Sequence, residues 1–326
     1  MLLPRATTQS RGYSPPLTEC APSTNNFTDV ETMPGGLTEN NADAVKYLGV
    51  EHLLDVACRQ YDSLDKLETE QQILKFQSVQ EKDFDILSAD DTRPCKFVRF
   101  QYHRPTKLLL VKVMPGWDHE GVVALIRKLV DKELDLMDVD EETFSWGSPR
   151  NELGDWSKEP DACWAPALSS DKPTCVVGVG TSESESYLSI DARRWLEAPQ
   201  SPVQVVITIS FKYLCAETDE NPLHISVWKR GRGLSNVSTR NSVLPAVRTA
   251  HLDVWNIGGY LSVSGVNRDV DAERPVFADG IVLPLELFIG RPPMNPKEHD
   301  IVITPDKLFW IMEKLWRNRR IRGISQ

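Results

Sequence analysis

Acidic residues precede two neighbouring apolar segments in an order that could support metal-ion chemistry. Glu120 lies near the start of a long helical pattern, and Glu159-Pro160-Asp161 opens a strand-like segment that a second apolar strand, 175–180, follows. Metal-dependent phosphodiester cleavage uses carboxylates that converge on one or two Mg²⁺ ions, which polarise the phosphate and activate water. Acids on adjacent strands, with a further acid from the preceding helix, are a common way to build such a site. This layout is present here.

Each part of this pattern also has a simpler interpretation. Pro160-Asp161 is a common turn dipeptide, Glu120 suits a helix N-terminus electrostatically, and residues 175–179 are typical of a buried core strand. The order and spacing therefore favour the fold more strongly than they favour catalysis.

Other chemistries lack their sequence signatures. Gly178-Val-Gly180 lacks the third glycine and the downstream acid of a dinucleotide-binding fingerprint, and neither a Walker Gly-Lys-Ser nor a Gly-x-Ser-x-Gly motif occurs. His119-Glu120 is only the first half of a zinc-binding H-E-x-x-H motif. The six cysteines form no C-x-x-C pair, so a buried structural role and a reducing intracellular compartment, cytoplasm or nucleus, are expected.

The charge is unevenly distributed along the chain. The formal net charge is -10; residues 1–95 carry 8 Lys+Arg against 16 Asp+Glu, whereas the remainder carries 29 against 31. Two basic clusters, 228–233 and 316–323, could bind a phosphate backbone, although such runs are also typical of a solvated surface. No apolar stretch is long enough for a membrane helix. The basic residues that could contact nucleic acid are Lys229, Arg230, Arg232, Arg317, Arg319 and Arg320.

The first part of the chain divides into three regions by composition. Residues 1–44 are rich in Pro, Ser, Thr and Asn and are expected to be disordered. Residues 45–95 show helical spacing of apolar side chains and predict a helical arm that could dock a protein partner. From residue 96 onward the pattern becomes alternating, and 96–102 with 106–114 predicts a β-hairpin.

The remainder, residues 96–326, predicts a mixed β-sheet flanked by helices. A long amphipathic helix over 119–137 should have Asp118 as its N-cap, and a capping box at Ser182 should open a second helix that runs to about Trp195. The further predicted strands cover 161–168, 173–180, 202–214 and 222–230; residues 246–292 should be β-rich and irregular, and a last helix covers 306–319. The predicted fold class is α/β (α+β) with a mixed central sheet.

Several stretches are similar to a family of uncharacterised fungal proteins that is related to the PD-(D/E)XK nuclease superfamily of restriction endonuclease type. The similarity extends from about Val50 to the C-terminal helix. The stretches are VEHLLDVACRQYDSL, VQEKDFDILSADDTRPCKFVRFQYH, SKEPDACW, PTCVVGVGTSES and DARRWLEA.

The resemblance implies a set of site residues. Asp161 matches the metal-binding aspartate of that family, and Glu120 lies in the helix that can supply a further acid. Gly178 stands where the family pattern has a second acid, and Gly180 stands where a nuclease of this type has lysine. Arg194 of the following helix, or its neighbour Arg193, could take the place of the lysine as a phosphate-stabilising group.

The missing acid should weaken the metal site. Asp161 and the backbone carbonyl near Val179 are the expected ligands, and Mg²⁺ gives up its hydration reluctantly without more carboxylates. Mg²⁺ binding is therefore expected to be weak or absent. Three hypotheses follow: a degenerate nuclease-fold protein that binds nucleic acid or a protein, a working Mg²⁺-dependent DNA or RNA endonuclease in which Glu159 or Glu183 replaces the missing acid, and an interaction module without nucleic-acid contact.

Overall fold

The computed structural model describes most of the chain after residue 42. The described residues are 43–323 except for 67, 90–92, 115, 169–171, 182–184, 212–221, 232–243, 258–259 and 268–279. The disorder predicted for residues 1–44 therefore falls almost entirely outside the described residues.

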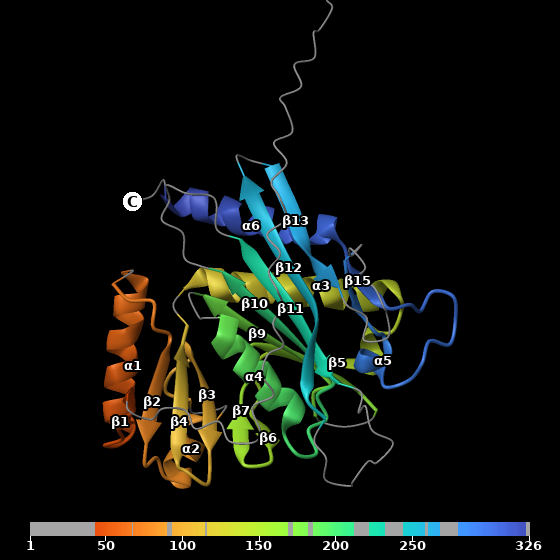
Figure 1. Cartoon of the computed structure of the whole chain (residues 1–326). Helices are drawn as coiled ribbons and strands as arrows, with labels where there is room; N and C mark the ends of the chain where they lie inside the picture. The colour runs from red at the N-terminus through yellow and green to blue at the C-terminus, as the bar shows by residue number, and fades with distance from the viewer. Residues whose placement is uncertain are drawn as a thin grey trace, which may run out of the picture. The chain divides into compact units, whose positions relative to one another are not determined.

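A seven-stranded mixed sheet forms the centre of the described fold (Figure 1). Its strand order is β13-β12-β11-β10-β9-β8-β5, and β9 and β10 run parallel while the other neighbours are antiparallel. The parallel pair requires a crossover connection, which contains helix α4. The strand bounds are β5 Thr143–Trp146, β8 Ala162–Pro166, β9 Cys175–Thr181, β10 Val205–Phe211, β11 Leu223–Arg230, β12 Ala246–Ile257 and β13 Tyr260–Asn267.

A second sheet contains the predicted hairpin. Strands β3 and β4 pair antiparallel as expected, but they belong to a six-stranded sheet of order β1-β2-β4-β3-β7-β6 and not to the central sheet. Strand β2 lies in a stretch whose pattern is helix-compatible, and it pairs with β4, so this part of the chain shares a sheet with the hairpin. The bounds are β1 Val45–Lys46, β2 Ile73–Gln77, β3 Val98–His103, β4 Leu108–Val113, β6 Asn151–Leu153 and β7 Trp156–Lys158.

Helices cover both faces of the central sheet. The buried side chains of α3 and α6 share a core with one face, and those of α4 pack on the opposite face, as Figure 1 shows for α3 and α4. The helices are α1 Val50–Asp65, α2 Glu81–Leu87, α3 Trp117–Leu136, α4 Glu185–Glu197, α5 Glu286–Ile289 and α6 Pro305–Gly323. The remaining described elements are a short pair of strands, β14 Ile281–Leu283 and β15 Ile301–Ile303, and a 3₁₀ turn at Asp140–Glu142.

Two predicted helix starts have different outcomes. The N-cap of α3 is Gly116, with φ 85°, and not Asp118, which lies in the first turn, where its charge still favours the helix dipole. The capping box at Ser182 lies outside the described residues, although the helix predicted after it is present as α4.

The mixed α/β fold class is confirmed, and the two sheets meet where the candidate acids lie. Residues 159–161 lead directly from the end of β7 in the second sheet to the start of β8 in the central sheet. Asp161 therefore lies where the two sheets meet. Among the described helices, none is both long enough and apolar enough to span a membrane.

Candidate active site

Asp161, directly before β8, lies beside Gly178 on the adjacent strand β9. The Asp161 amide donates to the carbonyl of Val177 at 3.0 Å, and strands β8 and β9 continue as an antiparallel pair. The Asp161 side chain is only 3% exposed, and its Oδ2 accepts a hydrogen bond of 2.7 Å from the backbone amide of Val179. The structure therefore brings together three of the positions that the sequence places at the site, Asp161, Gly178 and Val179.

The ammonium group of Lys112 contacts the two oxygens that were expected to bind a metal ion. Its Nζ lies 3.3 Å from Asp161 Oδ2 and 2.5 Å from the carbonyl oxygen of Val179. Lys112 comes from β4 of the second sheet, and its side chain is 9% exposed. Charge-assisted hydrogen bonds of this kind are stronger than neutral ones, so a buried lysine here neutralises Asp161 internally.

The other oxygen of Asp161 faces two further basic side chains. Oδ1 is 3.3 Å from His119 Nε2 and 3.8 Å from Arg99 Nε. Burial alone would raise the pKa of Asp161, but Lys112, His119 and Arg99 together hold that pKa well below its ordinary value. Burial likewise opposes the charged form of His119, yet Asp161 raises the His119 pKa above its ordinary value. The cluster is therefore an ionised aspartate that lies among two cations, Lys112 and Arg99, and a histidine whose protonated form it favours.

Glu120 lies beside this cluster but on its solvent side. Its Oε1 is 3.6 Å from Arg99 Nη2 and 3.6 Å from His119 Nδ1, and its side chain is 59% exposed. The nearby His119 lowers the pKa of Glu120, and burial opposes this effect less strongly. Glu120 thus contacts two of the basic side chains that face Asp161.

A second acid, Asp191, lies next to the position where Gly178 lacks one. A Cβ added at Gly178 would lie 4.0 Å from Asp191 Oδ2, which is ordinary van der Waals contact. Asp191 lies on α4 and pairs with the buried Lys158, whose Nζ is 2.7 Å from Oδ1. Burial lowers the pKa of Lys158 to about 8. Burial also opposes the ionised form of Asp191, but the charge of Lys158 favours that form, and the pKa of Asp191 is lowered overall. This acid is thus neutralised by a lysine as well.

Arg194 occupies a different part of the same region. Its Nη1 donates to Gln101 Oε1 at 3.3 Å, and its guanidinium lies over the Trp156 ring at 4.5 Å from the ring centroid. Gln101 lines the same pocket as Asp161, so this side chain connects Arg194 to the site.

Of the two acids considered as replacements, Glu159 is fully engaged. Arg93 donates to both of its oxygens, at 3.1 and 2.7 Å, and the Phe100 amide donates to Oε2 at 3.0 Å. Since this carboxylate joins β3 to the segment before β8, its contacts are those of a structural ion pair. Glu183 lies outside the described residues.

Several of these side chains line one small pocket between the sheets and α4. Cationic groups from the second sheet lie in it together with carboxylates from the segment before β8 and from α4. It is lined by Arg99, Gln101, Lys112, Glu159, Pro160, Asp161, Val177, Gly178, Leu188, Asp191 and Trp195.

Lys112 and Asp191 were not predicted as site residues, although each leaves a signal in the sequence. Lys112 is a charge inside an apolar strand, and a lysine there is buried only when it is paired. Asp191 shares the buried face of α4 with Leu188 and Trp195, where an acid also requires a partner. A charged residue on a predicted apolar face would have indicated both.

The residues predicted to contact nucleic acid have different environments. Lys229 is half-buried; Arg230 donates to the carbonyl of Leu196 at 2.8 Å and also to that of Ser201, which ties α4 to β11. Arg317 is exposed and pairs with Glu313 at 3.5 Å. Arg232 lies outside the described residues, and the side chains of Arg319 and Arg320 in α6 are likewise outside them.

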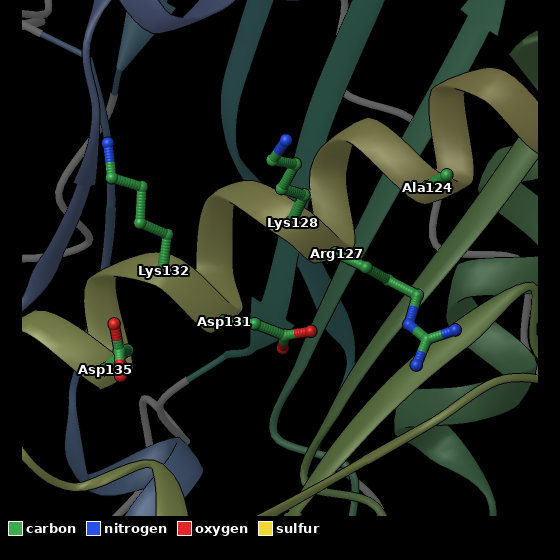
Figure 2. A pocket seen from close by; sticks show the side chains of 6 residues that line it. All are labelled: Ala124, Arg127, Lys128, Asp131, Lys132 and Asp135. Atoms are coloured by element: carbon green, nitrogen blue, oxygen red, sulfur yellow. The ribbon is translucent and has the colours of Figure 1, made fainter.

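A second hollow lies along the outer face of α3 and carries mixed charge (Figure 2). Lys128 and Lys132 extend from the helix, while Asp131 Oδ1 accepts a hydrogen bond of 2.9 Å from Trp164 Nε1. Because acids and bases alternate along the helix and Asp131 has a structural partner, this hollow lacks the converging carboxylates that metal chemistry requires.

Comparisons with known proteins provide one weak similarity. No protein-family model matches the sequence, and no curated protein is significantly similar to it. A solved structure from Anabaena variabilis ATCC 29413, described as "a putative nuclease belonging to DUF820", matches with a TM-score of 0.28 and 12% identity, and the match covers 43% of this chain and 81% of that chain.

Proposed function

We propose that this chain is a degenerate PD-(D/E)XK nuclease-type protein that acts by binding nucleic acid or a protein partner and not by cleaving a phosphodiester. The single observation that carries this proposal is the position of Lys112. Its Nζ contacts Asp161 Oδ2 and the Val179 carbonyl oxygen, which are the two ligands expected for a metal ion.

A divalent ion would have to replace this ammonium group. Mg²⁺ prefers near-octahedral oxygen ligands at about 2.0–2.1 Å and keeps its water unless carboxylates replace it. With Lys112 and Arg99 near Asp161, a dication at the same place would meet two positive groups, and a third when His119 is protonated, which raises the electrostatic cost of binding. The physical expectation is weak or absent Mg²⁺ binding.

A binding role is supported by the basic side chains outside the pocket. Lys229 and Arg317 are at least partly exposed, and Lys or Arg groups neutralise phosphates with a strong dependence on salt. The segment 45–95, with its acidic N-terminal helix, is the surface through which a protein partner would bind.

The alternative function, a Mg²⁺-dependent endonuclease, is favoured by one observation. Asp191 Oδ2 lies close to where a side chain at Gly178 would begin, so an acid from α4 could replace the missing strand acid. In that case Asp161 and Asp191 would bind the metal ion together, and Lys112 or Lys158 would replace the lysine that is missing at position 180.

A cleavage and metal-binding assay separates the two functions. Wild type, Asp161→Ala, Asp191→Ala and a double variant Lys112→Met/Gly178→Glu are incubated with plasmid, single-stranded DNA and RNA in Mg²⁺ or Mn²⁺. The exposed Asp135→Ala of α3 is the matched control for loss of an acid. Metal binding is followed by thermal stabilisation, since a ligand of the native state raises the melting temperature.

The degenerate-site proposal predicts no metal-dependent cleavage by wild type and no stabilisation by Mg²⁺, whereas the double variant gains Mn²⁺-dependent stabilisation. Cleavage by wild type that both Asp161→Ala and Asp191→Ala abolish, and that Asp135→Ala leaves intact, would refute it in favour of the endonuclease. Fluorescence anisotropy with labelled DNA and RNA at two salt concentrations then tests nucleic-acid binding directly.

A further inference from the structure

Two histidines and an aspartate converge on one face of the central sheet, and none of them belongs to the pocket around Asp161. His224 lies on β11 directly opposite Asp253 on β12, and His251 lies two residues before Asp253. Side chains on alternate positions of a strand point to the same face, so these three share a face with each other. Leu223, Ile225 and Leu252, their neighbours in sequence, point into the core on the other side.

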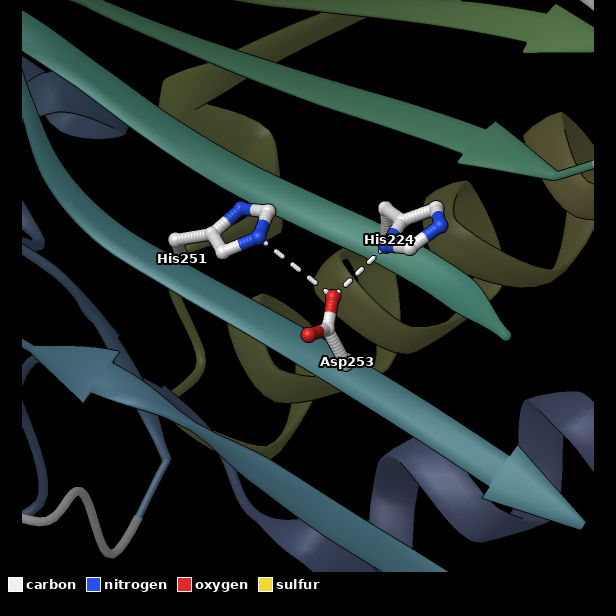
Figure 3. Close-up of side chains that lie close together, drawn as sticks. All are labelled: His224, His251 and Asp253. Atoms are coloured by element: carbon white, nitrogen blue, oxygen red, sulfur yellow. Dashed lines mark hydrogen bonds and ion pairs between the residues drawn. The ribbon is translucent and has the colours of Figure 1, made fainter. Parts of the chain in front are cut away.

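The ligand-type atoms of these three residues lie close together. Figure 3 shows both imidazoles directed at one carboxylate oxygen of Asp253. His224 Nδ1 is 2.6 Å and His251 Nε2 is 3.4 Å from Asp253 Oδ1, and the three candidate atoms all lie within 4.8 Å of one another. The side chains are 36%, 19% and 25% exposed for His224, His251 and Asp253, so an ion can reach them from solvent.

Ser226 provides the orienting contact that a metal-binding histidine usually has. Its hydroxyl is buried and lies 2.8 Å from Nδ1 of His251, from the directly opposite position on β11. If Nδ1–H donates to this hydroxyl, the lone pair of Nε2 points at the carboxylate of Asp253, and a metal ion between them can bind both, as a proton on Nε2 otherwise does. Ligating histidines are commonly fixed in this way through their second ring nitrogen.

We propose that His224, His251 and Asp253 form a binding site for a divalent transition-metal ion of the Zn²⁺ type. Imidazole nitrogen suits Zn²⁺, Co²⁺ and Ni²⁺, whereas Mg²⁺ and Ca²⁺ prefer oxygen ligands. Zn–N and Zn–O bonds of about 2.0–2.2 Å place tetrahedral ligand atoms roughly 3.3 Å apart. The distance of 3.4 Å between His251 Nε2 and Asp253 Oδ1 already fits this spacing. A small rotation of the His224 side chain would lengthen the shorter distance, 2.6 Å, between His224 Nδ1 and Asp253 Oδ1. Three protein ligands leave a fourth position for water or a ligand.

The test is a titration of the full-length protein with Zn²⁺ by calorimetry and with Co²⁺ by visible absorption. Wild type should bind one equivalent, and a tetrahedral Co²⁺ site should give an intense visible band. His251→Ala and the double variant His224→Ala/Asp253→Ala should abolish this binding. Ser226→Ala should weaken it by about 10- to 100-fold, as loss of an orienting contact does.

Two controls distinguish this site from nonspecific metal binding and from binding in the Asp161 pocket. His299→Ala removes an exposed histidine on another element and should leave the titration unchanged. Asp161→Ala should also leave it unchanged. Circular dichroism without metal shows that each variant is folded. Absence of an equivalent of tightly bound Zn²⁺ in wild type, or binding that survives in a folded His224→Ala/Asp253→Ala variant, would overturn the proposal.

Discussion

Breaking the ion pair between Lys112 and Asp161 by removing the lysine charge should be one of the most destabilising single changes in this protein. Lys112→Met keeps most of the side-chain volume and removes the charge. Removing one partner of a buried ion pair generally costs about 3–5 kcal/mol, because the other charge stays buried without compensation. His119, Arg99 and the Val179 amide still contact Asp161, so the lower end, about 3 kcal/mol, is expected.

A double-mutant cycle checks the origin of this loss. Asp161→Asn in the Lys112→Met background removes the uncompensated charge, so the double variant should be more stable than the sum of the two single losses by about 1–3 kcal/mol. The assay is urea denaturation of wild type and the three variants, followed by circular dichroism at neutral pH.

The control is Lys297→Met, which breaks the ion pair with Asp138 at 2.8 Å, where both side chains are largely exposed. Exposed pairs contribute little, so its denaturation midpoint should stay close to that of wild type. If Lys112→Met has as small an effect as Lys297→Met, or if the Lys112 and Asp161 losses are simply additive, the inference that Lys112 neutralises Asp161 is wrong.

The same cluster predicts how stability depends on pH. The folded-state pKa of Asp161 is lowered, so its contribution is present above the unfolded value of about 3.9 and is lost as the pH falls through the folded value. The pKa of His119 is raised, so its contribution is complete below about pH 6.5 and is lost as the pH rises through the folded value. Thermal melts over a range of pH should show both losses of stability in wild type and neither in Asp161→Asn. If the melting temperatures of the two proteins change in parallel with pH, this prediction is wrong.

Two further predictions concern residues outside the pocket. Gly265 has φ +151°, and a Cβ added there would lie 2.2 Å from the His251 carbonyl oxygen, so Gly265→Ala should destabilise the protein by more than about 2 kcal/mol in a thermal melt. A Cβ added at Gly147 would have nothing within 4 Å, so the control Gly147→Ala should be nearly neutral in the same melt. Arg230→Ala should lower the stability by about 1–3 kcal/mol without a specific loss of nucleic-acid binding, because the Arg230 guanidinium donates to backbone carbonyls. Lys229→Ala should weaken nucleic-acid binding, as measured by fluorescence anisotropy, and leave the stability unchanged. Equal behaviour of the two variants in both assays would contradict the second prediction.

The local elements could be predicted from the sequence because their patterns are local. The alternation at 96–102 and 106–114 predicts β3 and β4, and the apolar spacing at 119–137 predicts most of α3. The order of Asp161 and the strand that contains Gly178 also predicted their adjacency, since consecutive strands commonly pair.

The tertiary structure decided which charges meet. Lys112 lies in the second sheet, and Asp161, 49 residues further along the chain, directly precedes β8 of the central sheet. Lys158 and Asp191 are 33 residues apart. Periodicity shows which face of a strand or helix is buried, but not which residue from another element lies opposite it. Burial makes each of these charges depend on a partner, and only the packing of the two sheets and α4 supplies the lysines that neutralise both acids.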